Sequence, residues 1–327
     1  NYGGGNSSGH VRVYQYNGTS WEQLGNDIDG EAAEDYSGMS VSLSSDGTIV
    51  AIGAPYNGDN GNNSGHVRIY QYNGTSWEQL GNDIDGEAQY DQSGYSVSLS
   101  FDETIVAIGA IRAKNNDGNG ENSGHVRIYQ YNGTSWEQLG NDIYGEAADD
   151  LSGHSVSLSS DGTIVAIGAY YNDGVNGQDS GHVRVYQYNG TSWEQLGNDI
   201  DGETAGDWSG YSVSLSSDGT IVAIGAFYND GVNGNNSGHV RIYELKTIQP
   251  TTTMMPTTTM MPTTTMMPTT TMMPTTTMMP TTTMMPTTTM MPTTTTHQNY
   301  YRTTLLRTHY YAHTTIAHYY TTVHYTT

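Results

Sequence analysis

The chain has 327 residues, 33 of them acidic and ten basic (Lys or Arg), which gives a formal net charge of −23. Such acidity repels nucleic acid and anionic membranes and can attract cations, with Ca²⁺ the natural candidate because oxygen ligands are abundant. Solubility is the simpler interpretation of the charge. The sequence contains no cysteine and no run of 18 apolar residues, so it predicts no membrane span.

The acidic residues are confined to one part of the chain. Residues 1–249 hold all 33 acids and eight of the ten bases, a local balance of −25, whereas residues 250–327 hold only Arg302 and Arg307. We therefore expect a repeat domain at 1–249, a Thr/Met/Pro-rich stalk at 250–296 and a Thr/Tyr/His-rich extended segment at 297–327.

A long repeat fills the first segment. Its tetrapeptide Gly-His-Val-Arg recurs at nearly even steps, beginning at Gly9, Gly65, Gly124, Gly181 and Gly238. Periods of several tens of residues are typical of propellers, solenoids and arrays. Residue 1 falls inside a repeat, so we expect either a processed precursor or a longer chain.

One repeat, residues 37–86, predicts four strands of five to seven residues. In three of them, at 40–44, 66–72 and 76–80, polar and apolar residues alternate along the chain. The fourth, at 48–54, is a short apolar run. Asn73-Gly74 predicts a two-residue type I′ hairpin, which needs a positive φ at both positions. No stretch has the period of a helix. Four antiparallel strands per repeat predict an all-β propeller blade, whose Ser-rich first strand lies innermost because small side chains let blades converge.

Three motifs recur along residues 1–245: Ser-Gly-Tyr-Ser-Val-Ser-Leu-Ser, Ile-Val-Ala-Ile-Gly-Ala and Gly-His-Val-Arg-Ile-Tyr. Together they resemble the FG-GAP repeat of integrin α-subunit-type β-propellers, which implies a propeller of four-stranded blades. The Gly-Ala-Pro element of that family survives only at Gly53-Ala54-Pro55. Its usual Phe is replaced by Ser37, Ser93, Ser152 and Ser209.

The strand count leaves the ends of the propeller unmatched. With strands named a to d, the chain opens with c and d at 9–29, continues with three full blades, and ends with a, b and c at 209–245. These make up about four to five blades. A four-bladed ring would leave one c strand free to pair with a neighbouring molecule. The alternative is a larger ring completed by blades upstream.

Loops rich in Asn, Asp and Gly join strands b and c. The resemblance implies Ca²⁺ in loops at this position, since hard cations prefer several oxygens on a tightly turning loop. The Asp-x-Asp-x-Asp-Gly spacing is absent, and a plain turn-forming loop is the simpler interpretation. The candidate Ca²⁺ ligands are Asp173, Asn176, Asp179, Asp230 and Asn233.

Other residues recur once per blade. A His stands two residues before an Arg in every repeat, and we interpret it as structural (His10, His66, His125, His182 and His239). The acidic stretch at 27–35 is interpreted as a solvated rim. For the outer-strand tryptophans we expect packing between blades, with sugar stacking as the alternative (Trp21, Trp77, Trp136 and Trp193).

Two kinds of sugar acceptor are predicted. Asn-Gly-Thr at the hairpin tips fits N-glycosylation of a secreted protein, at Asn17, Asn73, Asn132 and Asn189. The hexapeptide Thr-Thr-Thr-Met-Met-Pro occurs seven times from Thr251 to Pro292. Its regular prolines favour an extended polyproline II stalk, and Thr-rich segments of this kind are O-glycosylation substrates. Candidate acceptors there are Thr251, Thr252, Thr253, Thr257, Thr258, Thr259, Thr263, Thr264 and Thr265.

The sequence shows neither a His-Glu-x-x-His motif nor a phosphate-binding glycine loop, and we expect no enzymatic activity. The leading hypothesis is a structural subunit of a secreted, glycosylated extracellular filament or surface appendage. It would form a helical or linear homopolymer through its stalk and propeller edges. The alternative is a cell-surface adhesion or ligand-binding propeller that depends on Ca²⁺. A propeller hydrolase is a third class, and the near-identity of the blades argues against it.

Overall fold

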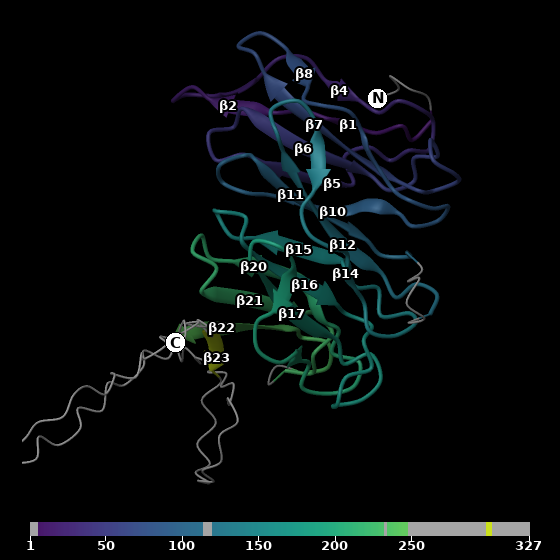
Figure 1. Cartoon of the computed structure of the whole chain (residues 1–327), viewed down its shortest axis with the longest axis vertical. Helices are drawn as coiled ribbons and strands as arrows, with labels where there is room; N and C mark the ends of the chain where they lie inside the picture. Colours follow the sequence, from purple (N-terminus) through teal and green to yellow (C-terminus); the bar gives the residue numbers. More distant parts are fainter. Residues whose placement is uncertain (1–5, 114–119, 232–233, 248–298, 303–327) are drawn as a thin grey trace, which may run out of the picture. The chain divides into compact units, whose positions relative to one another are not determined.

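The computed structural model describes residues 6–113, 120–231, 234–247 and 299–302. Every regular element in these ranges is a β-strand (Figure 1). Within the same ranges, no helix has the length and apolar character of a membrane span. The predicted stalk at 250–296 and its O-glycosylation acceptors lie outside the described residues.

Three complete blades repeat one antiparallel topology. The first consists of β5 (Ser40–Leu43), β6 (Ile49–Ala54), β7 (His66–Tyr72), β8 (Trp77–Gln79) and β9 (Ile84–Asp85). The second consists of β10 (Ser93–Leu99), β11 (Ile105–Ala110), β12 (His125–Tyr131), β13 (Trp136–Gln138) and β14 (Ile143–Tyr144). The third consists of β15 (Ser155–Leu158), β16 (Ile164–Ala169), β17 (His182–Tyr188), β18 (Trp193–Gln195) and β19 (Ile200–Asp201). The predicted all-β fold of four-stranded antiparallel blades is confirmed.

The outer position of each blade is divided between two short strands. In the first blade, β8 pairs with the end of β7, where Tyr72 lies opposite Trp77. The start of β7 pairs instead with β9, where His66 lies opposite Asp85. The segment between β8 and β9 therefore passes beside His66, which the sequence pattern did not indicate.

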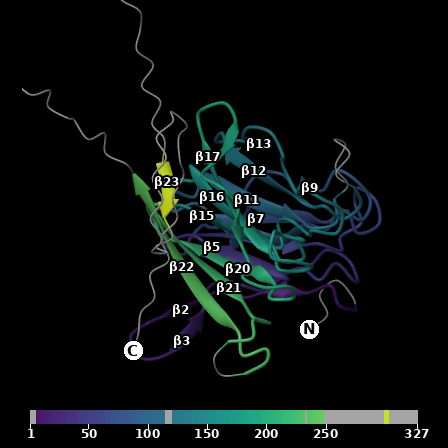
Figure 2. The same ribbon diagram turned by 90° about the horizontal axis from the view of Figure 1, so that it is seen from below.

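The ends of the array are incomplete blades. The opening strands form two pairs, β1 (His10–Val11) with β4 (Ile28–Asp29) and β2 (Tyr14–Tyr16) with β3 (Trp21–Gln23). The last blade contains β20 (Ser209–Leu215), β21 (Ile221–Ala226) and β22 (His239–Thr247). Its outer neighbour is β23 (Asn299–Arg302), drawn in yellow beside the green β22 in Figure 2. The surplus c strand is therefore paired within the chain.

The main packing between the described blades is between neighbours in chain order. The inner strands make these junctions, with β6 against β10, β11 against β15 and β16 against β20. In the part of the chain that the structure describes, the last blade makes no comparable packing with the first. The four-bladed closure considered from the sequence is not formed, because the opening strands pair with one another and not with β21 or β22.

Small residues set the spacing of the junctions. Ser40 Oγ donates a hydrogen bond to the Gly94 carbonyl at 2.7 Å, and the same bond recurs from Ser96 to Gly153. A Cβ added to Gly53 would lie 2.0 Å from the Gly94 oxygen, so only glycine fits there. The predicted innermost position of the Ser-rich strand is confirmed.

Apolar side chains fill each junction. At the junction of the first two complete blades, one side contributes Ile49, Ala51, Val67, Ile69 and Ile84, and the other contributes Val97, Val106 and Ile108. The outer-strand tryptophans extend this packing. Trp136 Nε1 donates to the Leu80 carbonyl and Trp193 Nε1 to the Leu139 carbonyl, both at 2.8 Å. The expectation of inter-blade packing is confirmed for Trp77, Trp136 and Trp193, whereas it is wrong for Trp21, which is 69% exposed.

The hairpin expected at Asn73-Gly74 is wrong in its type. The turn between β7 and β8 has four residues, and Gly74 alone of the pair has a positive φ, of 98°. Asn73 Oδ1 accepts hydrogen bonds from the backbone N–H groups of Thr75 and Ser76, each at 2.9 Å. The Asn side chain therefore supplies the turn that the type I′ backbone was expected to make.

Candidate metal centres at the blade junctions

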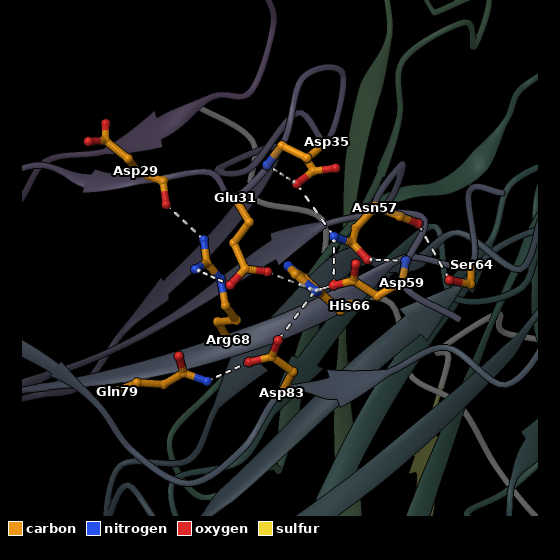
Figure 3. A network of polar contacts seen from close by, with 11 residues as sticks. Asp29, Glu31, Asp35, Asn57, Asp59, Ser64, His66, Arg68, Gln79 and Asp83 are labelled. Carbon is orange, nitrogen blue, oxygen red and sulfur yellow. Dashed lines mark hydrogen bonds and ion pairs between the residues drawn. The ribbon is translucent and has the colours of Figure 1, made fainter. Parts of the chain in front are cut away.

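Four side chains meet at the start of β7 (Figure 3). His66 Nδ1 lies 3.8 Å from Asp83 Oδ2, 3.9 Å from Asp59 Oδ2 and 4.0 Å from Glu31 Oε2. The four donor atoms lie within 4.8 Å of one another. Glu31 comes from the connection after β4, Asp59 from the loop between β6 and β7, and Asp83 from the segment between β8 and β9. We call these four residues the His66 cluster.

The histidine of this cluster is buried while its carboxylates reach solvent. The His66 side chain is 1% exposed, and neither ring nitrogen has a hydrogen-bond partner in the described residues. Buried polar groups in proteins almost always have a partner, so this ring needs an explanation. Its Nδ1 points at three carboxylate oxygens that lie too far away for hydrogen bonds.

Further contacts orient the carboxylates. Arg68 lies 3.2 Å from Glu31 Oε1, which leaves Oε2 toward the histidine. Gln79 donates to Asp83 Oδ1, which leaves Oδ2 toward the histidine. Asn57 donates to Asp59 Oδ2 at 3.2 Å. Metal ligands in proteins are held by such outer partners.

A second cluster occupies the same place in the third complete blade. His182 Nδ1 lies 3.9 Å from both Glu146 Oε2 and Asp199 Oδ2, and Gln195 donates to Asp199 Oδ1 at 2.7 Å. Burial lowers the pKa of His182 to about 4, so the ring is neutral near pH 7. We call Glu146, His182 and Asp199 the His182 cluster.

The His182 cluster lacks the third carboxylate. Asn60 and Asn176 hold equivalent loop positions, because their side chains donate to the carbonyls of Gly86 and Gly202. The residue before Asn60 is Asp59, whereas the residue before Asn176 is Val175. A valine has no donor atom, so the second cluster has three ligand groups.

The second complete blade has the histidine, but its described residues, which leave out 114–119, form no such cluster. Arg127 binds both carboxylate oxygens of Asp142, at 2.9 and 2.7 Å, and also contacts Glu87. Glu87 and Asp142, the counterparts of Glu31 and Asp83, therefore both contact the arginine. In the first blade, Arg68 turns instead to the Asp29 carbonyl at 2.8 Å, which leaves Asp83 to face His66.

The predicted Ca²⁺ ligands lie in the loops but are used differently. Asp173 and Asp230 each accept a hydrogen bond from a backbone N–H of their own loop, at Asp179 and Asn236. Asn176 donates to Gly202, and Asn233 lies outside the described residues. Neither carboxyl-rich cluster described above includes any of these residues.

The four predicted N-glycosylation sites all lie at exposed turns between strands c and d. In each, the Asn Oδ1 accepts two backbone hydrogen bonds from the residues two and three positions later, as at Asn132 from Thr134 and Ser135. The open space around the neighbouring Gly133 leaves the tip accessible. Occupancy by sugar stays a prediction.

Sequence reasoning missed the carboxylates of both clusters. The stretch containing Glu31 was interpreted as a solvated rim, and the histidines as structural. One signal existed, since an Asp follows the His at the same spacing in every complete repeat, as Asp83 follows His66. That spacing is not sufficient, because His125 and Asp142 share it and do not face one another in the same way.

Comparison with known families supports the class of protein. Three segments match the family described as the FG-GAP repeat, at residues 28–70, 145–186 and 200–243. The second complete blade lies between these matches, although its topology is the same. A comparison with curated proteins found no match to the chain.

The fold is all-β with propeller-type blades, and three segments of the chain match the FG-GAP repeat. Repeats of this kind are typical of extracellular proteins, and they often serve adhesion or ligand binding and often bind Ca²⁺. In this chain, acidic groups that could hold a metal gather at two blade junctions.

Proposed function

We propose that the protein is a non-enzymatic structural subunit of a secreted, glycosylated extracellular filament or surface appendage. It assembles as a homopolymer through the two ends of its blade array, with the Thr/Met/Pro-rich stalk as a further contact. The observation that supports this proposal is the exposure of an inter-blade surface on the last blade.

The valine that follows the histidine in each repeat illustrates that exposure. At the inner junctions this position is fully buried, and Val67, Val126 and Val183 are each 0% exposed. The equivalent Val240 on β22 is 67% exposed. Ile221 on β21 is also exposed, whereas the equivalent Ile105 and Ile164 are buried. The last blade therefore presents a surface that elsewhere packs against a following blade.

At the opening end of the array, residues that elsewhere pack against a preceding blade are exposed. Val41 on β5 is 54% exposed, whereas the equivalent Val97 is 9% exposed. Leu43 and Trp21 are exposed as well, and their equivalents pack against a preceding blade. Exposed apolar surface of this kind marks interaction sites.

A second copy of the chain fits these ends best. The repeats are nearly identical, so the exposed residues of the last blade are of the types that pack against a following blade at the inner junctions. The exposed residues of the opening end are of the types that pack against a preceding blade. Contacts between two different surfaces are heterologous, and they generate open filaments when the rotation does not close. Head-to-tail addition therefore accounts for both exposed ends.

The test compares two substitutions of the same type. Val240→Asp places a charge on the end surface, and Val175→Asp places it on a loop valine that is 87% exposed and away from the ends. We expect Val240→Asp to abolish polymers seen by electron microscopy and light scattering, and Val175→Asp to leave them intact. Monodisperse monomers of the unsubstituted, glycosylated protein would contradict the proposal.

A pocket favours the second candidate function, ligand binding in adhesion. A cavity of about 560 Å³ is lined by Tyr171 and Trp208 together with the polar side chains of Arg112, Asn122, Asp149 and Gln178. Aromatic rings beside charged and amide groups suit a carbohydrate. Binding to a glycan array that is lost in Trp208→Ala would support this function, and loss on chelation would add the Ca²⁺ dependence. No binding by the intact protein would exclude it.

A further inference from the structure

We propose that the His66 cluster is a binding site for a divalent transition-metal ion of the Zn²⁺ type, and that the His182 cluster is a weaker site for the same ion. Each ion would join two consecutive repeats. The inference does not depend on the filament proposal, since it rests on the junctions inside one chain.

The donor set selects the class of metal. One imidazole nitrogen with two or three carboxylate oxygens is a ligand set of Zn²⁺ and neighbouring first-row ions. Ca²⁺ takes six to eight oxygen ligands and does not need an imidazole. The site is therefore different in chemistry from the loop sites predicted for Ca²⁺.

The distances fit a shell that closes on an ion. Tetrahedral Zn²⁺ with bonds of about 2.0–2.1 Å sets its donors about 3.4 Å apart. Nδ1 of His66 lies 3.8 to 4.0 Å from the three oxygens, so each needs to move by about half an ångström. The ring is fixed by burial, and the side chains of Glu31 and Asp59 are exposed enough to make that movement.

The second observation is the orphaned ring itself. Neither ring nitrogen of His66 has a hydrogen-bond partner in the described residues, and the nearest carboxylate oxygen lies 3.8 Å from Nδ1. In the second complete blade, an arginine neutralises the equivalent acid by a bidentate contact. In the first blade, Arg68 donates to the Asp29 carbonyl and contacts Glu31 Oε1, and one oxygen of each of the three acids faces the ring nitrogen. A cation between them would satisfy both the carboxylates and Nδ1.

The position of the ligands gives the ion a structural role. Glu31 precedes β5 and Glu146 precedes β15, whereas the two histidines lie on β7 and β17. Each acid thus comes from the connection that enters the blade, and each histidine from the third strand of that blade. An ion bound only by the folded array stabilises it by mass action, more strongly as the metal concentration exceeds the Kd.

The experiment titrates Co²⁺ into the EDTA-treated full chain and follows its visible absorption, then displaces it with Zn²⁺ in a calorimeter. We expect a tighter and a weaker site. Asp59→Asn, on an exposed loop, should weaken the tighter site by about tenfold or more, at least the effect of losing an outer partner. Val175→Asp should strengthen the weaker site, because it supplies the missing carboxylate.

Matched controls use the histidines. His66→Gln and His182→Gln should each remove one site, and His125→Gln should remove neither, since Arg127 occupies the acids of that blade. If His66→Gln does not fold, the exposed Asp59→Asn and Val175→Asp variants still decide the matter. Absence of Co²⁺ absorption in the unsubstituted chain would overturn the proposal. Binding of Ca²⁺ alone, or Co²⁺ binding that neither exposed variant changes, would overturn it as well.

Discussion

Trp77 Nε1 donates a hydrogen bond to the backbone carbonyl of Leu24, 2.7 Å away, across the junction between two repeats. The same side chain lies over Gly25, where a Cβ would come within 2.9 Å of the indole ring. The glycine and the tryptophan are therefore required together, one on each side of the junction. The recurrence of both residues along the chain follows from this single contact.

Replacing one such tryptophan tests its energy. Trp136→Phe keeps a ring at the junction but leaves the Leu80 carbonyl without its donor, which should destabilise the protein by about 1–3 kcal/mol. Trp21→Phe is the matched control, because Trp21 is exposed at the open end. The midpoint of urea unfolding should fall only for Trp136→Phe. Equal shifts of the midpoint in both variants would contradict the role of the junction.

The inner strands allow a sharper comparison. Gly109→Ala would place a Cβ 2.1 Å from the Gly153 carbonyl of the next blade, and 2.5 Å from Ser96 Oγ. Gly225→Ala meets only the corresponding hydroxyl, Ser212 Oγ at 2.4 Å, because no blade follows. We expect Gly109→Ala to cost several kcal/mol or prevent folding, at roughly the top of the range for point mutants. Gly225→Ala should be much milder, as measured by thermal unfolding, and equal losses would refute the explanation.

A buried histidine predicts a pH dependence. Burial lowers the pKa of His154 to about 4, with Tyr211 O 3.2 Å from its Nδ1 and the ring of Tyr170 against it. The unfolded histidine titrates near 6.5, so the unfolded chain binds more protons between these values. The contribution of His154 to stability should therefore be fully present above pH 6.5 and be lost as the pH drops toward 4.

The variant His154→Gln should reduce that slope. His125 and His182 also have pKa values near 4, so some acid dependence remains. Denaturant unfolding at pH 7.5, 6.0 and 5.0 gives the measurement. An unchanged slope in the variant would show that His154 does not contribute.

Two substitutions at the Asn73 turn can distinguish its role in glycosylation from its role in folding. Thr75→Ala removes the acceptor pattern but keeps the backbone N–H that donates to Asn73 Oδ1. Expressed in a eukaryotic secretory host, this variant should lose the mass of one N-glycan and keep its thermal midpoint. Asn73→Ala should lose the glycan and also about 1 kcal/mol, because the turn loses two hydrogen bonds. An identical glycan mass in Thr75→Ala and the unsubstituted protein would show that the tip is unoccupied.

The sequence was sufficient for the strands and their order within a blade. Alternation and the small inner residues are local signals, so β5 to β8 could be placed from residues 37–86 alone. The turn type was not predictable in this way, because Asn73 could act through either its backbone or its side chain. Ring closure could not be decided from the sequence, since it depends on which distant strands the two ends pair with.

The metal clusters needed information that no single repeat contains. His66 and His125 have the same neighbours in sequence, and an Asp follows each of them at the same spacing. What differs is the direction of one arginine, toward the Asp29 carbonyl in one blade and toward Asp142 in the next. The Asp29 carbonyl belongs to the preceding repeat, whereas Asp142 belongs to the same blade as Arg127, so one contact crosses the junction and the other stays within a blade.

The neighbour-only packing of the blades has a consequence for how such chains can vary. Each junction is formed by the same serine, glycine, valine and tryptophan positions, and the main contacts between strands of the described blades join neighbours in chain order. In such quasi-one-dimensional arrays, stability is a sum of units and nearest-neighbour interfaces. Duplicating or deleting one whole unit, such as 181–237, would therefore change the length of the array without requiring a single new interface.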